Sequence, residues 1–188
     1  MEARLFEEGT VPEWTTAAWY ATREVAPHLE QAGHTERLQL AASMLRGLPA
    51  DLTVVDLGAG DGGLLSILGR KGWGYDLAPA NVAAAAARGV TVTVADIMDV
   101  DALKWGDIAV ATEILEHLVD PHGYVRAIKS KYLLASSPYT ETKDSHYEFH
   151  TFAWDLVGYK TMLENAGWRV LKQDTAWICQ CVLAVRES

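Results

Sequence analysis

Cysteine is scarce in this 188-residue chain, which contains two, Cys179 and Cys181, one residue apart. On a strand, side chains two positions apart point to the same face, so this pair fits adjacent core or edge positions. A zinc site requires more ligands at paired spacings, and nothing in this cysteine usage implies an oxidising compartment. The length suffices for a packed core without disulfides or metals as staples.

Basic clusters and long apolar runs are also missing. Lys and Arg number 16 against 25 Asp and Glu, and the net charge is -9. Contact with phosphates relies on clustered basic residues, so we expect neither a nucleic-acid nor a membrane-surface partner. The alanine-rich stretch 82–87 is too short to span a bilayer, and residues 1–10 lack the apolar core of a signal peptide. We therefore expect a cytoplasmic protein, either a monomer or a homodimer.

The spacing of apolar residues changes after Pro49. Residues 11–49 show helical spacing, whereas strands and helices alternate from residue 50 onward. Expected strands are 52–57, 73–76, 90–95, 107–112 and 132–136, and expected helices are 62–71, 79–88, 121–129 and 154–166. Two final strands, 169–173 and 177–185, lie too close together for a crossover helix and must pair antiparallel. This order predicts an α/β fold: a three-layer α/β/α sandwich around a seven-stranded, mostly parallel sheet whose last strand is antiparallel. It divides the chain into an N-terminal helical extension or lid, 1–49, and a main domain, 50–188.

The segment VVDLGAGDGG, residues 54–63, predicts a ligand-binding turn between the first strand and its helix. Asp76 follows Asp56 by twenty residues, at a second strand tip where a carboxylate can hold ribose hydroxyls. Gly58, Gly60 and Gly63 also satisfy the dinucleotide pattern G-x-G-x-x-G, which keeps an NAD(P)-dependent oxidoreductase as an alternative. The carboxylates of Asp56 and Asp61 would repel a diphosphate but suit an ammonium group. A glycine turn that binds no ligand is the remaining alternative.

Several motifs together resemble one family, the class I S-adenosylmethionine-dependent methyltransferases. Residues 54–65 resemble their motif I, Gly74-Tyr75-Asp76 their ribose-binding strand tip, and Ala95-Asp96-Ile97 their adenine-capping motif. ATEILEHLVDP, residues 111–121, resembles motif IV as found in the ubiquinone-type O-methyltransferases. The resemblance covers about residues 50–188 and implies a Rossmann-like fold with S-adenosylmethionine as cofactor and S-adenosylhomocysteine as product.

The resemblance also implies a set of cofactor contacts. Asp76 would hold the ribose, Leu77 and Ile97 would pack against the adenine, and Asp96 would meet its exocyclic amine. Glu113 would lie near the sulfonium. The residues implied around the methionine part are Asp56, Gly58, Ala59 and Gly60.

Candidate reactive groups follow the fourth expected strand. Glu113, Glu116 and His117 would share one face if their segment is helical, and His117 is our candidate general base, with Glu113 beside it. A structural His117 bonded to a loop carbonyl is an equally open interpretation. With a downstream histidine, these residues resemble the metal set of the small-RNA 3′-terminal 2′-O-methyltransferases, and His146 and His150 are the candidates for that fourth ligand. A divalent ion at Glu113, Glu116, His117 and His150 is therefore an alternative to a metal-free site.

Acceptor-binding candidates lie in two segments. Tyr139, His146 and His150 belong to a long polar loop after the fifth strand, which is either functional or merely a surface segment. Tyr20, with the neighbouring Trp14 and Trp19, could form a lid, although packing of the tryptophans onto the sheet is the simpler interpretation.

These observations favour a methyltransferase acting on oxygen or nitrogen of a small-molecule acceptor. Three alternatives stay open: a metal-assisted RNA 2′-O-methyltransferase, an NAD(P)-dependent oxidoreductase, and a non-catalytic subunit that binds S-adenosylmethionine.

Overall fold

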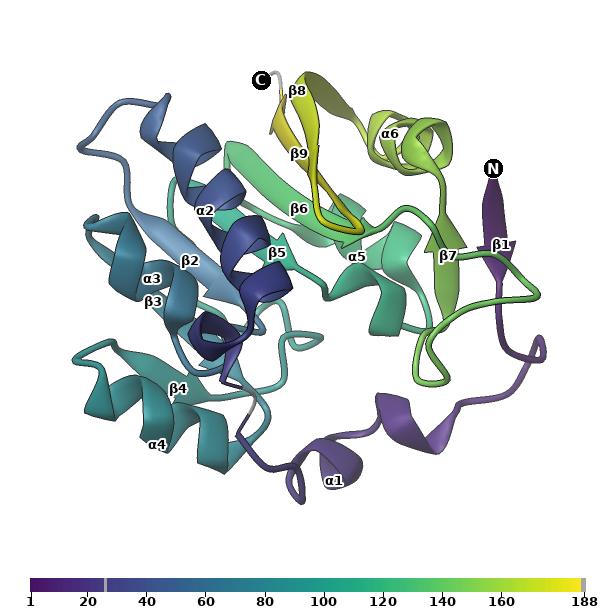
Figure 1. Cartoon of the computed structure of the whole chain (residues 1–188), viewed down its shortest axis with the longest axis horizontal. Helices are drawn as coiled ribbons and strands as arrows, with labels where there is room; N and C mark the ends of the chain where they lie inside the picture. Colours follow the sequence, from purple (N-terminus) through teal and green to yellow (C-terminus); the bar gives the residue numbers. More distant parts are fainter. Residues whose placement is uncertain (26, 187–188) are drawn as a thin grey trace.

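A seven-stranded sheet forms the centre of the computed structural model, which describes residues 1–25 and 27–186 (Figure 1). Its strand order is β4-β3-β2-β5-β6-β9-β8, and neighbouring strands are parallel except where β9 pairs antiparallel with β6 and β8. The predicted mostly parallel sheet with an antiparallel last strand is therefore confirmed. The strands are β2 (Val54–Leu57), β3 (Gly72–Asp76), β4 (Val92–Val94), β5 (Ile108–Thr112), β6 (Tyr132–Pro138), β8 (Trp168–Ala176) and β9 (Cys179–Arg186).

Helices cover both faces of this sheet because its central strands are apolar on both sides. Val54 of β2 points into one core, whereas its neighbour Val55 points into the other. The first core contains buried residues of α2 and α3, and the second contains buried residues of α5 and α6. The helices are α1 (Ala17–Tyr20), α2 (Ala32–Arg46), α3 (Gly63–Leu68), α4 (Pro79–Ala87), α5 (Pro121–Ala127) and α6 (Leu156–Asn165), with short 3-10 turns η1 (Glu13–Thr15), η2 (His28–Glu30) and η3 (Leu115–His117).

A second, two-stranded sheet joins the start of the chain to its C-terminal third. Strand β1 (Glu2–Arg4) pairs antiparallel with β7 (Phe152–Trp154), which the sequence patterns did not indicate (Figure 1). The prediction that a helix begins at Trp154 is wrong. Trp154 is a buried strand residue, and α6 begins after Asp155, whose carboxylate accepts the Gly158 amide.

The carboxyl ends of β2, β3 and β5 meet at one edge of the sheet, as the parallel topology requires. The segment before α2 passes close to this edge (Figure 1). Within residues 1–25 and 27–186, no helix combines the length and apolarity that crossing a bilayer demands.

Candidate functional site

The turn after β2 depends on glycine. Gly58 and Gly60 have φ values of 73° and 55°, in the left-handed region that favours glycine. A Cβ atom at Gly58 would also collide with the Ile114 side chain. Glycine at these positions therefore lets the backbone approach the cavity at points where a side chain would obstruct it.

Carboxylates and a carbonyl already accept hydrogen bonds from the amides of this turn. The Gly60 amide donates to Asp76 Oδ2 at 2.8 Å, and the Gly63 amide donates to Asp61 Oδ1 at 3.1 Å. The Gly58 amide donates to the Tyr75 carbonyl at 2.8 Å. The positive end of α3 thus faces negative side chains of the protein itself.

Asp56 is buried at the end of β2, and its Oδ1 has no hydrogen-bond partner among the described residues. Burial and then the charge of Asp76 raise the pKa of Asp56 to about 7, while Arg37 opposes this shift. A buried carboxyl oxygen without a partner carries a desolvation cost that a cationic group would relieve.

Two adjoining cavities open above these residues, one of about 600 Å³ and one of about 100 Å³. Gly58, Asp76, His117 and Tyr20 line both. The larger one is bordered by Asp56, Ala59, Gly60 and Glu113, and the smaller one by Leu77, Asp96 and Ile97. The structure thus brings every predicted cofactor residue to the wall of one of these two adjoining cavities, and Asp76 lines both.

The predicted acceptor residues separate into two groups. Tyr20 and His150 line the larger cavity. Tyr139 and His146 are not among the residues that line either cavity: the Tyr139 amide pairs with the Ile178 carbonyl, and His146 is exposed. The structure therefore does not bring Tyr139 and His146 to the cavity that Tyr20 and His150 line.

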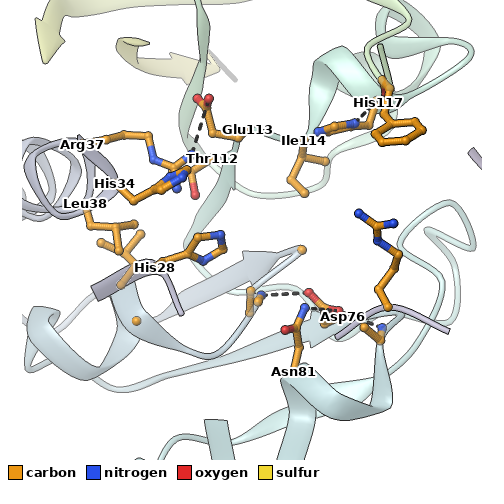
Figure 2. A pocket seen from close by; sticks show the side chains of 18 of the residues that line it. His28, His34, Arg37, Leu38, Asp76, Asn81, Thr112, Glu113, Ile114 and His117 are labelled. Carbon is orange, nitrogen blue, oxygen red and sulfur yellow. Dashed lines mark hydrogen bonds and ion pairs between the residues drawn. The ribbon is translucent and has the colours of Figure 1, made fainter. Parts of the chain in front are cut away.

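The expected helical face of Glu113, Glu116 and His117 does not form. Glu113 adopts a left-handed φ of 56°, and the 3-10 turn η3 begins only at Leu115. The Glu113 carboxylate accepts hydrogen bonds from Ser136 Oγ at 2.7 Å and Cys179 Sγ at 3.2 Å, and it lies 3.5 Å from Arg37 (Figure 2). Because the Glu113 carboxylate points away from Glu116 and His117, the four-residue metal set that includes Glu113 is also wrong.

His117 faces the cavity from the far side of this turn. Its Nδ1 lies 3.0 Å from the Phe149 carbonyl oxygen, as the structural interpretation of this histidine anticipated. Burial and the neighbouring His150 lower the pKa of His117 to about 4, so the ring is neutral near pH 7. A neutral ring that donates from Nδ1 keeps a lone pair on Nε2.

Arg37 is a functional candidate that sequence reasoning missed, and two histidines, His28 and His34, interact with it electrostatically. Arg37 is 2% exposed, lies 3.5 Å from the Glu113 carboxylate and interacts electrostatically with Asp56, while His28 approaches Asp61 at 3.8 Å. Figure 2 shows Arg37, His34 and His28 on one side of the cavity and His117 on the other. The signal was present in the sequence, because Arg37 occupies a core-facing position of α2 one turn before Ala41.

Aromatic residues of the N-terminal segment lie beside the larger cavity, which Trp19 and Tyr20 line. Trp14 and Trp19 contact Phe149 of the long loop, with ring centroids 6.1 Å and 5.0 Å apart, and Arg23 lies 4.1 Å from the Trp19 ring. The simpler expectation, that these tryptophans pack onto the sheet, is wrong. They join the two segments that were predicted to surround the acceptor.

Comparisons with known proteins agree with this geometry. Residues 26–173 match a family model described as a methyltransferase domain, whereas no curated protein matches the chain. The N-methyltransferase NodS from Bradyrhizobium japonicum WM9, solved with S-adenosyl-L-homocysteine, is 13% identical with a TM-score of 0.75 over 93% of this chain and 98% of its own. Magnesium protoporphyrin IX methyltransferase from Synechocystis PCC 6803, solved with the same product, is 16% identical with a TM-score of 0.67 over 89% and 91%.

A third similar structure comes from a complex between a methyltransferase activator and a methyltransferase of Haloferax volcanii. It is 20% identical, with a TM-score of 0.69 over 85% of this chain and 92% of that chain. At these identities the solved structures establish the fold, whereas the family model covers most of the sequence. The chain therefore belongs to the methyltransferase domain family, and it has the Rossmann-like fold of enzymes that use S-adenosylmethionine.

Proposed function

We propose that this enzyme transfers the methyl group of S-adenosylmethionine to an oxygen or nitrogen atom of a small-molecule acceptor. In this reaction a bond forms between the acceptor atom and the methyl carbon while the sulfur–carbon bond breaks. The electron pair of that bond stays on sulfur, which becomes the neutral thioether of S-adenosylhomocysteine, and the acceptor loses a proton. The protein must align the two reactants and assist the loss of that proton.

The observation that carries this proposal is the occupation of the glycine-turn amides by carboxylates. A diphosphate binds at such a turn by accepting hydrogen bonds from free amides at a helix N-terminus. Here the Gly60 and Gly63 amides donate to Asp76 and Asp61. A dinucleotide would have to displace these carboxylates and then remain beside them, which disfavours the oxidoreductase alternative.

The charges on either side of the turn suit the methionine part of the cofactor. The unpartnered Oδ1 of Asp56 would meet its ammonium group, and Arg37 with His28 would face its carboxylate. Asp76 would accept the ribose hydroxyls, and the smaller cavity, bordered by Leu77, Asp96 and Ile97, would hold the adenine. The likeness of residues 111–121 to the ubiquinone-type O-methyltransferases supports an oxygen acceptor within this proposal.

The acceptor would occupy the remaining part of the larger cavity, between Tyr20, His117 and His150. His117 is the proposed base, because its Nε2 carries a lone pair. The segment 1–49 would act as the lid through Trp19 and Arg23, which cover Phe149. A net charge of -9 argues against RNA as the acceptor.

Turnover tests this function directly. The purified protein is incubated with S-adenosylmethionine and a panel of phenols, alcohols and amines, and formation of S-adenosylhomocysteine is followed. We expect S-adenosylhomocysteine to form only when an acceptor of one chemical class is present. Tight cofactor binding without transfer to any member would instead favour the non-catalytic alternative.

Replacing Asp56 with asparagine tests the ammonium contact. Loss of one charge-assisted hydrogen bond, worth about 1.5–3 kcal/mol, predicts an affinity for S-adenosylhomocysteine that is about 10- to 100-fold lower at pH 7.5. Wild-type affinity should rise between pH 5.5 and 7.5, since Asp56, with its pKa raised to about 7, must ionise to meet the ligand. Calorimetry across this range should show a flatter profile for Asp56→Asn.

Asp56→Asn should lower the affinity for the product but raise the stability of the folded protein without cofactor. Because the folded protein raises the pKa of Asp56 from 3.8 to about 7, its contribution to stability is full below pH 4 and declines as pH rises through 7. Asp56→Asn should therefore melt at a higher temperature than the wild type at pH 8 without cofactor. A variant that melts lower and binds the product equally well would contradict this role for Asp56.

A further inference from the structure

Three polar side chains meet beside the cavity, where η3 lies against the end of the long loop. One ligand atom from each of Glu116, His117 and His150 can be chosen so that all three lie within 4.8 Å of one another. Two hydrogen bonds fasten the loop here, since the Thr151 amide and hydroxyl both donate to the Glu116 carbonyl, at 2.6 Å and 2.7 Å. The backbone therefore fixes the approach of His150 to Glu116 and His117.

Both histidines are held through the same ring nitrogen. The Nδ1 atom of His117 lies 3.0 Å from the Phe149 carbonyl oxygen, and the Nδ1 atom of His150 lies 2.6 Å from Glu141 Oε2. In the neutral ring, each contact to an acceptor places the proton on Nδ1 and leaves a lone pair on Nε2. Metal-binding histidines are typically oriented in this manner, by a carbonyl or a carboxylate behind the ring.

Glu116 is the third member and is fully buried, at 0% exposure. Neither of its carboxylate oxygens has a hydrogen-bond partner within the part of the chain that the structure describes. A buried carboxylate in this situation is expensive unless a cation compensates it. Glu113 does not belong to this group, since its carboxylate contacts Ser136 and Cys179 instead.

We propose that Glu116, His117 and His150 form a binding site for one divalent first-row transition-metal ion, with open coordination positions toward the cavity. Ligand atoms bound at about 2.0–2.2 Å lie roughly 3–4 Å apart, so small side-chain rotations would close the observed group around an ion. Two imidazoles and one carboxylate suit Zn²⁺, Mn²⁺ or Co²⁺, whereas Mg²⁺ prefers oxygen ligands. His117 and His150 line the larger cavity, so the open positions face the space assigned to the acceptor.

This inference rests on the proposed function for its purpose. A metal ion held by these three residues would supply Lewis-acid chemistry, polarising an acceptor oxygen and lowering the pKa of a bound hydroxyl. With the ion bound, the Nε2 lone pair of His117 would hold the metal, so this arrangement would replace the direct base role proposed above, and the proton of the bound hydroxyl would leave to solvent. The substrate class that fits is a hydroxylated small molecule with an oxygen available for coordination.

Metal titration of the full chain tests the site. After treatment with a chelator and dialysis, Co²⁺ is added and the visible d–d absorption of bound cobalt is followed, while Zn²⁺ binding is measured by calorimetry. We expect one equivalent of either ion to bind and an equal concentration of Mg²⁺ to leave both signals unchanged. Absence of stoichiometric Co²⁺ and Zn²⁺ binding by the wild type would overturn the proposal.

Matched variants locate the ion. Glu116→Gln and His150→Ala should each lower Zn²⁺ affinity by at least about tenfold, as should Glu141→Ala, which removes the acceptor behind His150. His146→Ala, an exposed histidine of the same loop, and Glu113→Gln should retain wild-type Zn²⁺ affinity. Equal losses in His146→Ala, or unchanged affinity in Glu116→Gln, would refute the assignment.

Two further measurements distinguish failure of the metal site from unfolding and from failure of the cofactor assignment. Without metal, Glu116→Gln should melt close to the temperature of the wild type, because glutamine keeps the size and shape of the buried Glu116 side chain, so weaker Zn²⁺ binding cannot be attributed to unfolding. S-adenosylhomocysteine binding is measured on the same samples. Product binding without metal binding would reject this site alone, and metal binding without product binding would reject the cofactor assignment alone.

Discussion

Replacing Asp76 with alanine is expected to lower the affinity for S-adenosylhomocysteine by about 100-fold or more, since two charge-assisted hydrogen bonds to the ribose would be lost at about 1.5–3 kcal/mol each. The Asp76 carboxylate also accepts the Gly60 amide at 2.8 Å and the Ala78 amide at 2.8 Å. Its removal therefore releases the glycine turn as well. Isothermal titration calorimetry measures the change directly.

Asp99→Ala is the matched control for this experiment. Asp99 is exposed in the turn after β4 and lines neither cavity. It should bind the product as the wild type does, and circular dichroism should show that both variants are folded. Wild-type affinity in a folded Asp76→Ala protein would refute the ribose assignment.

His117→Ala should reduce turnover by about 10²- to 10⁴-fold, the usual contribution of a group that assists proton transfer. Affinity for S-adenosylhomocysteine should change far less, because the proposed role of the ring is to assist proton transfer through its Nε2 lone pair and not to bind the cofactor. Steady-state kinetics with the best acceptor and calorimetry with the product separate these two quantities.

His146→Ala, which alters an exposed histidine outside both cavities, should keep wild-type kinetics. If His117→Ala also retains full turnover, the contact between His117 and the Phe149 carbonyl is purely structural. The proposal that His117 assists proton loss would then be abandoned, whether directly or through a metal ion.

The central sheet could be predicted because its signals are local. Short Val-rich strands such as β2 alternate with helices that begin near glycine or proline, and each element carries its own pattern. The short connection between β8 and β9 alone required antiparallel pairing. The pairing of β1 with β7 had no such signal, because its two strands are three residues long and lie about 150 residues apart in the chain.

The cofactor side of the site was similarly accessible. Asp56, Gly58 and Gly60 lie in one contiguous turn, and the tips of the neighbouring parallel strands must meet the same sheet edge. Their gathering around one cavity followed from topology. Their contacts with a cofactor stay predictions that the variants described above test.

The reactive side depended on backbone conformations that residue types do not reveal. Glu113 is a non-glycine residue with positive φ, so it breaks the helical spacing on which the shared face with Glu116 and His117 was predicted. The group that does form adds His150 from a loop fastened by Thr151 to the Glu116 carbonyl. Contacts between segments this far apart in sequence require the folded structure.

Calorimetric titration of one protein preparation with S-adenosylhomocysteine and, separately, with NAD⁺ and NADP⁺ tests the central claim most directly. The carboxylate-occupied turn predicts saturable binding of the thioether nucleoside with one equivalent per chain and no measurable binding of either dinucleotide. Tight binding of NAD⁺ or NADP⁺, with none of S-adenosylhomocysteine, would contradict the account.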